Sequence, residues 1–336
     1  MSTDIARIRA VEATLAFTRR EDVAPDAERP GLLRARTLDF EAMSDPGSFD
    51  RRVCRVHDCS DGFVPELLEH GFAHADLSRA RRLQAVLERV RRAGRLDDES
   101  AAEIRRRLTG AVLRLSGGAR LWVLYLAREG FFMRRAGPAG VPLVRASGGM
   151  NDHDAAVSVH ADQDVHGTPV RQILRGAAPW LFRHESPDGC NARSRLLLVN
   201  VWIPLEQVTR PLALMDRRSI DRRAHQLRYG MPTDRFLRRE AALRINDVWT
   251  FLHDPEQRWY FTSEIDARTA YVFETLSTPH ASFMLPGEQR AAERYRRLTA
   301  AIAAVRDSDA EALGRVLAEG DGGDVGPEPA TAPLQR

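Results

Sequence analysis

The chain contains no lysine, because all 50 residues counted as lysine or arginine are arginine. This absence excludes chemistry that needs a lysine: Schiff bases, a lysine general base and the lysine of a phosphate-binding P-loop. Codon usage in a GC-rich genome explains the bias most simply, so the arginine content alone indicates no anionic substrate. With 47 acidic residues and a net charge of +3, the composition gives no reason to expect nucleic-acid binding.

Cysteine and long apolar segments are also scarce. Cys54, His57 and Cys59 in CRVHDC supply three of the four ligands that a structural zinc site needs, and Cys190 is far away, so we expect reduced thiols. No run of about 18 apolar residues occurs, and the N-terminal MSTDIARIRAVEATLAF carries charges where a signal peptide is apolar. A cytoplasmic protein without membrane contact is expected.

Several catalytic signatures are missing. The sequence has no G-x-S-x-G nucleophile elbow, no G-x-G-x-x-G dinucleotide fingerprint, no P-loop and no H-E-x-x-H zinc motif. Enzyme classes that depend on these local motifs are therefore disfavoured.

Residues 78–115 are expected to form a helical insertion. Apolar residues recur at i, i+3, i+4 and i+7 from Leu83 to Val90, which describes one helical face that stops at Gly94. A second helix is expected after Asp97, because acidic residues favour a helix N-terminus. The first seventy or so residues are expected to form peripheral strands and turns.

After about residue 119 the sequence pattern becomes typical of β-strands. Short apolar segments such as Leu121–Leu126, RLLLVNVWIPL, RWYFT and AYVFETL are separated by glycine and proline, which favours a sandwich or barrel over alternating βαβ units. An arginine-rich segment at about 219–239 is predicted to be helical or loop-like. Among the aromatic residues Trp202, Trp249, Trp259 and Tyr260, at least half are expected to be core.

The stretch SVHADQDVHGTP concentrates histidine and aspartate. On a strand, His160 and Asp162 project from the same face, so both can point at a common ion. A second imidazole would complete a two-histidine, one-carboxylate triad that holds Fe(II) on one side and leaves three positions open. His280, at a strand junction 118 residues after Asp162, is the candidate.

Other histidines are weaker candidates. His166 lies past the expected strand end and is predicted to be a loop residue, whereas His153 could line the mouth of the site. His184, His225 and His253 lie among charged or turn residues and are predicted to be on the surface.

Six segments in order resemble a family of oxygenases. They are LLEHGF, GGARLWVL, VHADQD, RLLLVNVWIPLEQVTRPLALMDRRSID, QRWYFTSEIDARTAYVFETL and HASF, between about residues 11 and 290. The most specific parts are H-x-D-Q and N-V-W-x-P-L followed by P-L-A-L-x-D. This order resembles the bacterial cephalosporin 7α-hydroxylase component and its fungal gibberellin desaturase and aspirochlorine oxidoreductase relatives.

The resemblance implies a mainly β fold with added helices, in which a double-stranded β-helix (jelly-roll) core carries a flanking helical layer. It also implies a non-haem Fe(II), 2-oxoglutarate-dependent dioxygenase of secondary metabolism, using O2 to hydroxylate or desaturate a small molecule, as in antibiotic biosynthesis. His160, Asp162 and His280 become the iron ligands. Because halogenases of this kind replace the carboxylate with a small residue, Asp162 argues against halogenation.

The expected domain organisation follows from these patterns. A single oxygenase domain spans 1–318, with the helical insertion at about 78–115, the β-helix core at about 119–290, a C-terminal helix at about 286–306, and a disordered tail at 319–336.

The resemblance also implies a basic residue that anchors the 2-oxoglutarate carboxylate, a role that suits arginine because a guanidinium matches a carboxylate in two-point geometry. The resemblance points to Arg290, ten residues after His280, although the segment around it is helical in pattern. Relatives often carry arginine where this chain has Ile203, and Arg210 could take over that role. Both arginines remain candidates.

Two alternatives stay open. The chain could be a metal-dependent enzyme on the same barrel that does not use 2-oxoglutarate, or a non-catalytic partner protein of a biosynthetic complex. The cephalosporin relative works beside a partner, so a homodimer or a partner enzyme is also a candidate arrangement.

Overall fold

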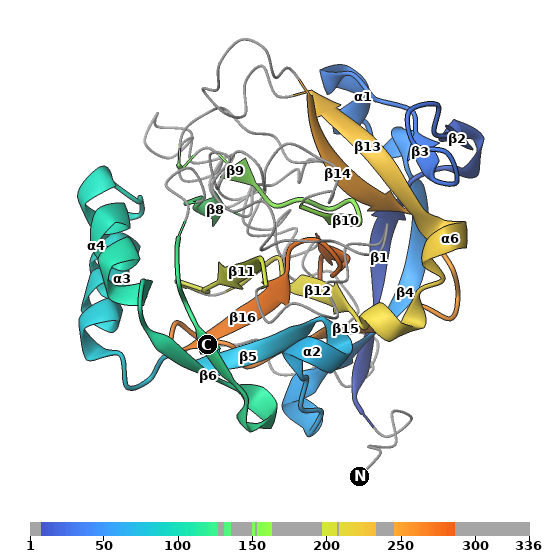
Figure 1. Ribbon diagram of the computed structural model, residues 1–336. Coiled ribbons are helices and arrows are strands. Elements are labelled where there is room, and N and C mark those ends of the chain that lie inside the picture. Colours follow the sequence, from blue (N-terminus) through green and yellow to red (C-terminus); the bar gives the residue numbers. More distant parts are fainter. Residues whose placement is uncertain are drawn as a thin grey trace, which may run out of the picture.

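The computed structural model describes residues 8–126, 131–135, 150–151, 153–162, 197–206, 208–232 and 245–285. The described chain is mainly β, with two curled sheets and few helices (Figure 1). The predicted fold class, a jelly-roll core with a flanking helical layer, is confirmed.

The larger sheet has N-terminal strands at both edges and strands from later in the chain between them. Its order among the described residues is β1 (Ala10–Phe17), β4 (Asp50–Asp58), β15 (Trp259–Phe261), β12 (Leu212–Met215), β17 (His280–Ser282), β10 (His160–Ala161), β14 (Ile245–Phe251), β13 (Gln226–Pro232), β3 (Leu33–Ala35) and β2 (Val23–Pro25). Within the described residues, the N-terminal strands therefore flank a block of six strands formed by residues 160–282.

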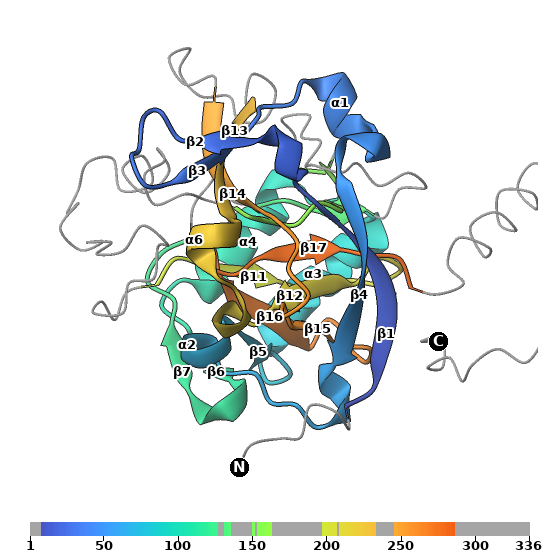
Figure 2. The same ribbon diagram turned by 90° about the vertical axis from the view of Figure 1, so that its right-hand side faces the viewer.

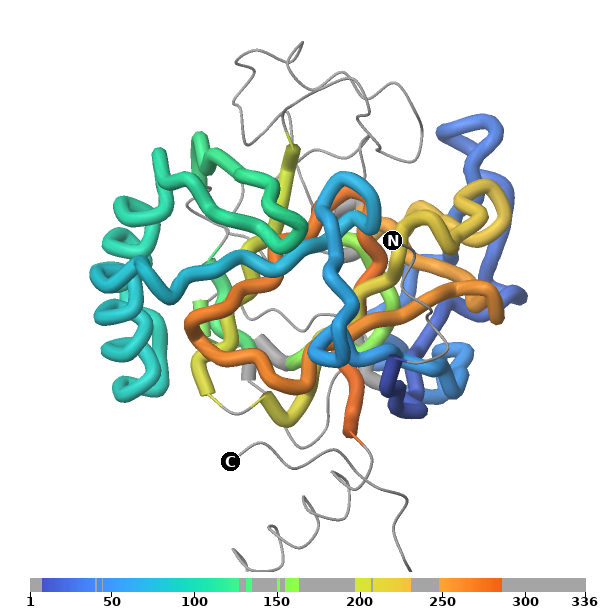
Figure 3. The backbone as a smooth tube through the Cα atoms, turned by 90° about the horizontal axis from the view of Figure 1, so that it is seen from below, coloured from blue at the N-terminus to red at the C-terminus, as the bar shows by residue number. Residues whose placement is uncertain are grey.

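The smaller sheet faces the middle of the larger one. Its order is β11 (Val199–Trp202), β16 (Thr269–Glu274), β5 (Phe72–Asp76), β6 (Val112–Leu115) and β7 (Arg120–Trp122). Figure 3 shows β5, in blue, beside β16, in orange, where they pair antiparallel. A short parallel pair, β8 (Arg134–Arg135) with β9 (His153–Asp154), lies outside both sheets.

Helices are short apart from two. The α-helices are α1 (Phe40–Ser44), α2 (Leu67–His70), α3 (Arg81–Ala93), α4 (Asp98–Leu108) and α6 (Arg222–His225). Single 3-10 turns are η2 (Arg20–Asp22), η3 (Pro46–Ser48), η4 (Cys59–Asp61), η5 (Ser116–Gly118) and η8 (Arg217–Ser219).

Both predicted helices are present, and they cover the outer face of the smaller sheet. The α3 face from Leu83 to Val90 packs with α4 against Ala75 and Val272 in one buried apolar cluster. Helix α3 stops because Gly94 adopts a left-handed conformation, with a φ of 62°. The Asp97 carboxylate accepts a hydrogen bond from the Ser100 backbone N–H at 2.7 Å and caps α4.

The core that positions the site lies between the two sheets. Leu212 and Leu214 from β12 meet Phe72, Tyr271 and Phe273 from the smaller sheet in a second buried cluster. Because alternate strand residues face opposite sides, one side of the smaller sheet packs on the helices and the other on this interior. The interior is therefore apolar and aromatic.

The first seventy residues form the edge strands β1 and β2 of the larger sheet, as expected, but many of their side chains are buried in its core. Strand β1 pairs with β4 over eight consecutive positions, and β4 pairs in parallel with β15 (Figure 2). Leu15, Phe17 and Val56 are buried with Trp249 and Trp259. Their apolar runs are short, so local pattern alone did not reveal that these residues contribute to the core of the larger sheet.

Two further expectations are corrected. In the predicted buried strand Leu121–Leu126 only β7 forms, and Trp122, Leu124 and Tyr125 are 65%, 53% and 60% exposed, since this run lies at a sheet edge. The segment at 219–239 is neither mainly helical nor loop where described, because β13 begins at Gln226.

The aromatic prediction is confirmed. Trp249, Trp259 and Tyr260 are fully buried, whereas Trp202 is half-buried. Cys54 and Cys59 are buried free thiols. Cys190, the predicted helix at 286–306 and the tail at 319–336 lie outside the described residues.

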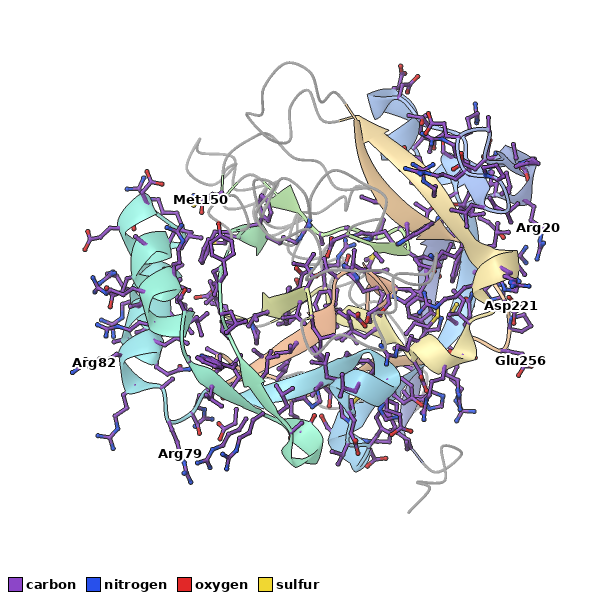
Figure 4. The ribbon with its side chains drawn as sticks, in the orientation of Figure 1. Arg20, Arg79, Arg82, Met150, Asp221 and Glu256 are labelled. Carbon is purple, nitrogen blue, oxygen red and sulfur yellow. The ribbon has the colours of Figure 1, made fainter. Side chains whose placement is uncertain are left out.

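Several charged side chains extend from the surface of the molecule. Arg79, Arg82 and Glu256 are exposed and point away from the molecule (Figure 4). Among the described residues, no helix is long and apolar enough to cross a membrane.

His74 on β5 gives the stability a pH dependence. Its Nε2 lies 2.8 Å from the Thr262 Oγ1, and burial lowers the pKa of His74 to about 4. The unfolded chain has an ordinary histidine pKa of about 6.5, so it binds more protons than the folded chain between these values. The free energy of unfolding should therefore fall as the pH drops from 6.5 to 4, by up to about 3 kcal/mol from this group.

Urea unfolding of the metal-free protein at several pH values checks this. The His74→Gln variant should lose part of the slope between pH 6.5 and 4, while contributions of the other histidines are common to both proteins and cancel. Identical slopes would contradict the assignment.

Candidate metal centre

Strand pairing brings two distant histidines together. β10 and β17 are antiparallel neighbours, and His160 lies directly opposite His280. Residues opposite each other in an antiparallel pair project from the same face with their Cβ atoms about 5 Å apart. The two imidazole rings are 4.4 Å apart between centroids.

Asp162 completes the cluster from the bend that follows β10. Its Oδ1 lies 3.5 Å from the His160 Nε2, and its Oδ2 lies 3.6 Å from the His280 Nε2. Candidate ligand atoms of all three residues lie within 4.8 Å of one another. Two imidazoles and one carboxylate at such separations fit a single divalent ion with open positions on one side.

The same local contact orients both imidazoles. The Nδ1 of His160 is 2.8 Å from the Ser158 carbonyl oxygen, and the Nδ1 of His280 is 3.1 Å from the Thr278 carbonyl oxygen. A carbonyl only accepts, so each Nδ1 carries the proton and donates, which leaves a lone pair on each Nε2. Ligating histidines are typically held in this way by a hydrogen bond from the other ring nitrogen.

Within the described part of the chain, the His160 Nε2 is a buried atom whose lone pair has no hydrogen-bond donor. Buried polar atoms nearly always have a partner, and an unsatisfied one is costly. Coordination to a metal ion would satisfy this atom, so the residues present fit the ion.

Burial and neighbouring groups keep His280 and Asp162 in the protonation states that metal binding needs. Burial lowers the pKa of His280 to about 4, with His160 adding to the effect and Asp162 opposing it, so His280 is neutral at pH 7. Burial alone would raise the pKa of Asp162, but interactions with His280 and His160 hold it well below its usual range. The carboxylate is therefore ionised and attracts a cation.

Asn200 belongs to the site and was missed by sequence reasoning. Its Nδ2 donates a hydrogen bond to the Asp162 Oδ2 from β11 of the smaller sheet. Phe273, paired with Asn200, packs its ring 4.7 Å from the His280 ring. Alternation in VNVW places Asn200 and Trp202 on one strand face, and this signal could have identified it.

His225 is not a surface residue as predicted. Its side chain is 10% exposed, and its Nε2 lies 3.3 Å from the Asp254 Oδ2. The fold buries it because the Leu252 backbone N–H donates to the His225 carbonyl and joins the end of α6 to the chain after β14. His225 takes no part in the triad.

For the remaining histidines considered in the sequence, no contact with the triad is found among the described residues. His253 is half-buried and contacts the Phe17 ring at 5.1 Å. The side chain of His153, and all of His166 and His184, lie outside the described residues.

Of the two arginines predicted to anchor 2-oxoglutarate, only Arg210 lies among the described residues. Arg290 lies outside the described residues, whereas half-buried Arg210 precedes β12. Leu212 pairs with Ser282, and the Phe283 N–H donates to the Pro211 carbonyl at 3.1 Å, which extends the ladder. His280 begins β17 and Ser282 ends it, and this register places Arg210 just past the Ser282 end. Half-buried Ile203, the other departure from the relatives, packs against the helix-side core.

Comparisons with known proteins give limited matches. A model of the "Oxidoreductase/YMDC permease-like domain" family matches residues 132–296, just under half of the chain. No curated protein matches the sequence.

Three solved structures of the iron and alpha-ketoglutarate-dependent endoperoxidase NvfI are similar. One in a different conformation is 18% identical with a TM-score of 0.48, and a single-substitution variant is 18% identical with 0.47; each match covers 85% of this chain and 92% of that one. A third is 19% identical with a TM-score of 0.44, covering 83% and 92%. Likeness at this level establishes no activity for this chain.

The geometry predicts binding of one divalent ion. Mn(II) titrated into the metal-free protein, followed by calorimetry, should bind with a stoichiometry of one. The His280→Ala variant should lose at least about 100-fold in affinity, more than the 10- to 100-fold typical of residues outside the ligand shell. His253→Ala, a half-buried histidine away from the triad, is the matched control and should bind as the unsubstituted protein does. Equal affinities of all three would rule out a metal at this cluster.

Proposed function

We propose that this protein is an Fe(II)- and 2-oxoglutarate-dependent oxygenase that uses O2 to hydroxylate or desaturate a small-molecule substrate. The convergence of His160, Asp162 and His280 carries the proposal. Two histidines and one carboxylate with open positions are typical of non-haem Fe(II) oxygenases. The sequence resemblance supports the same class, and the partly matching family model has an oxidoreductase description.

Three residues would hold the iron. His160 and His280 would each donate the lone pair of Nε2, and Asp162 would supply the one negative charge. Bound together, iron, 2-oxoglutarate and O2 supply an oxidant able to remove hydrogen from an unactivated carbon, with 2-oxoglutarate converted to succinate and CO2.

The protein around the triad restricts water. His160 and His280 are 4% and 5% exposed, and Phe273 packs against His280 from the apolar interior. A dry surround strengthens the electrostatic interactions of the ligands and limits side reactions of a strong oxidant with water. Asp162, whose side chain is 27% exposed, marks the side from which substrates would approach.

Arg210 is the proposed anchor of the distal 2-oxoglutarate carboxylate. Alternation along the extended ladder places Arg210 on the same strand face as Leu212 and Leu214, which belong to the interior cluster. In this extended ladder Arg210 lies opposite Met284. Met284 is four residues after His280, which corresponds to about 13 Å along a strand. An extended 2-oxoglutarate and an arginine side chain together span such a separation.

Keto-acid binding tests the proposed function directly. Anaerobic addition of Fe(II) and 2-oxoglutarate should produce a visible charge-transfer band, because the keto acid then chelates the metal through two oxygens. In Asp162→Ala the band and substrate-linked succinate should be lost while the circular dichroism spectrum is unchanged.

Each alternative gives a distinct result. Metal binding without the band would favour an enzyme that does not use 2-oxoglutarate, and absence of metal from protein purified without oxygen would favour a non-catalytic partner protein. Turnover of Asp162→Ala equal to that of the unsubstituted protein would refute the ligand assignment.

The anchor is tested with a pair of variants. Arg210→Met should raise the Kd of 2-oxoglutarate, measured by titrating the charge-transfer band, by about 10- to 100-fold, the size expected for losing a hydrogen-bonded charge pair. Arg290→Met should stay within about 3-fold. The reverse ranking would assign the anchor to Arg290.

A further inference from the structure

We infer that Asn200 is a positioning residue that makes Asp162 a one-oxygen ligand and thereby keeps a third metal position open. The inference rests on the proposed metal at the triad. It extends that proposal, because the three ligands alone do not determine how many positions the carboxylate occupies.

The two oxygens of Asp162 have different surroundings. Oδ2 accepts the hydrogen bond from the Asn200 Nδ2 and lies 3.6 Å from the His280 Nε2, whereas Oδ1 lies 3.5 Å from the His160 Nε2. A carboxylate that uses both oxygens occupies two of six positions around an octahedral ion, and one that uses a single oxygen occupies one. Because Asn200 engages one lone pair of Oδ2 and fixes the orientation of the carboxylate, Oδ1 would be the oxygen that binds the ion. Two imidazoles and one oxygen then leave three positions.

Three open positions are what the proposed chemistry needs. A two-oxygen keto-acid chelate fills two of them, and the third remains for O2. If Asp162 bound through both oxygens, only two positions would remain, and the keto acid would leave none for O2.

The smaller sheet fixes Asn200 in place. Val199 and Val201 pack toward the helix-side core, so Asn200 must face the opposite side. Trp202, two residues on, packs its ring 5.6 Å from the Tyr271 ring on the neighbouring strand. Asn200 therefore reaches Asp162 from a strand paired at four consecutive positions rather than from a loop.

An amide suits this role better than a charged donor. The uncharged Nδ2–H group orients the carboxylate without neutralising it, so the full negative charge stays available to the metal. An arginine at this position would form an ion pair and compete with the cation.

The number of water molecules on bound Mn(II) tests the inference. Water-proton relaxivity, measured on full-length protein saturated with Mn(II) and without 2-oxoglutarate, scales with the number of rapidly exchanging waters on the ion. The unsubstituted protein should carry three. Asn200→Leu keeps the side-chain size but removes the donor, so a second carboxylate oxygen can bind, and relaxivity per bound Mn(II) should fall by about a third.

Asn151→Leu is the matched control. Asn151 is a half-buried asparagine whose amide hydrogen bonds are with the Leu96 backbone, at 2.6 and 2.7 Å, away from the triad. Its relaxivity should equal that of the unsubstituted protein. If Asn200→Leu does not fold, Asn200→Ser removes the amide with less bulk and replaces it in the comparison.

The outcomes separate the two proposals. Failure of the unsubstituted protein to bind Mn(II) would refute the metal site itself. Binding with the same relaxivity in Asn200→Leu, or in Asn200→Ser where that variant replaces it, would overturn the role of Asn200 and leave the metal site intact. A folded Asn200 variant that binds no Mn(II), while Asn151→Leu binds normally, would overturn the one-oxygen role, because that role predicts retained binding with fewer waters on the ion.

Discussion

The pairing of β10 with β17 is the interaction on which the candidate site depends. It places His160 opposite His280, and both imidazoles turn the same ring nitrogen toward Asp162 because each Nδ1 is engaged by a carbonyl two residues earlier. β12 pairs with the other side of β17 and β14 with the other side of β10. The site is therefore built on the middle of a sheet, where strand neighbours on both sides restrict its movement.

Much of the site could be predicted from local sequence, and the part that could not depends on which strands pair. Residues i and i+2 share a strand face, so His160 and Asp162 were predictable as neighbours. His280 could be named as a candidate from its place at an expected strand junction, and the family resemblance supported it, but spacing alone does not say which distant strand lies beside β10. Asn200 was missed for the same reason. Its inward face was predictable by alternation, but its contact with Asp162 arises only when the two sheets face each other.

The same limit applied to the fold. The two helices were predictable because α3 carries a complete apolar face and Asp97 is a local cap. Leu121–Leu126 was predicted to be buried because it is apolar, yet Trp122 and Tyr125 lie at a sheet edge and are exposed. His225 was predicted to be exposed because its neighbours are charged, yet the chain after β14 covers it. Burial depends on what packs against a segment, and local composition does not contain that information.

The central claim is that one metal ion binds at the three-residue cluster. Anomalous diffraction from crystals grown with Mn(II), recorded on either side of the manganese absorption edge, tests it most directly. The account predicts a single strong peak about 2 Å from the Nε2 atoms of His160 and His280 and from one Asp162 oxygen. A peak elsewhere, or none at this cluster under saturating Mn(II), would contradict it.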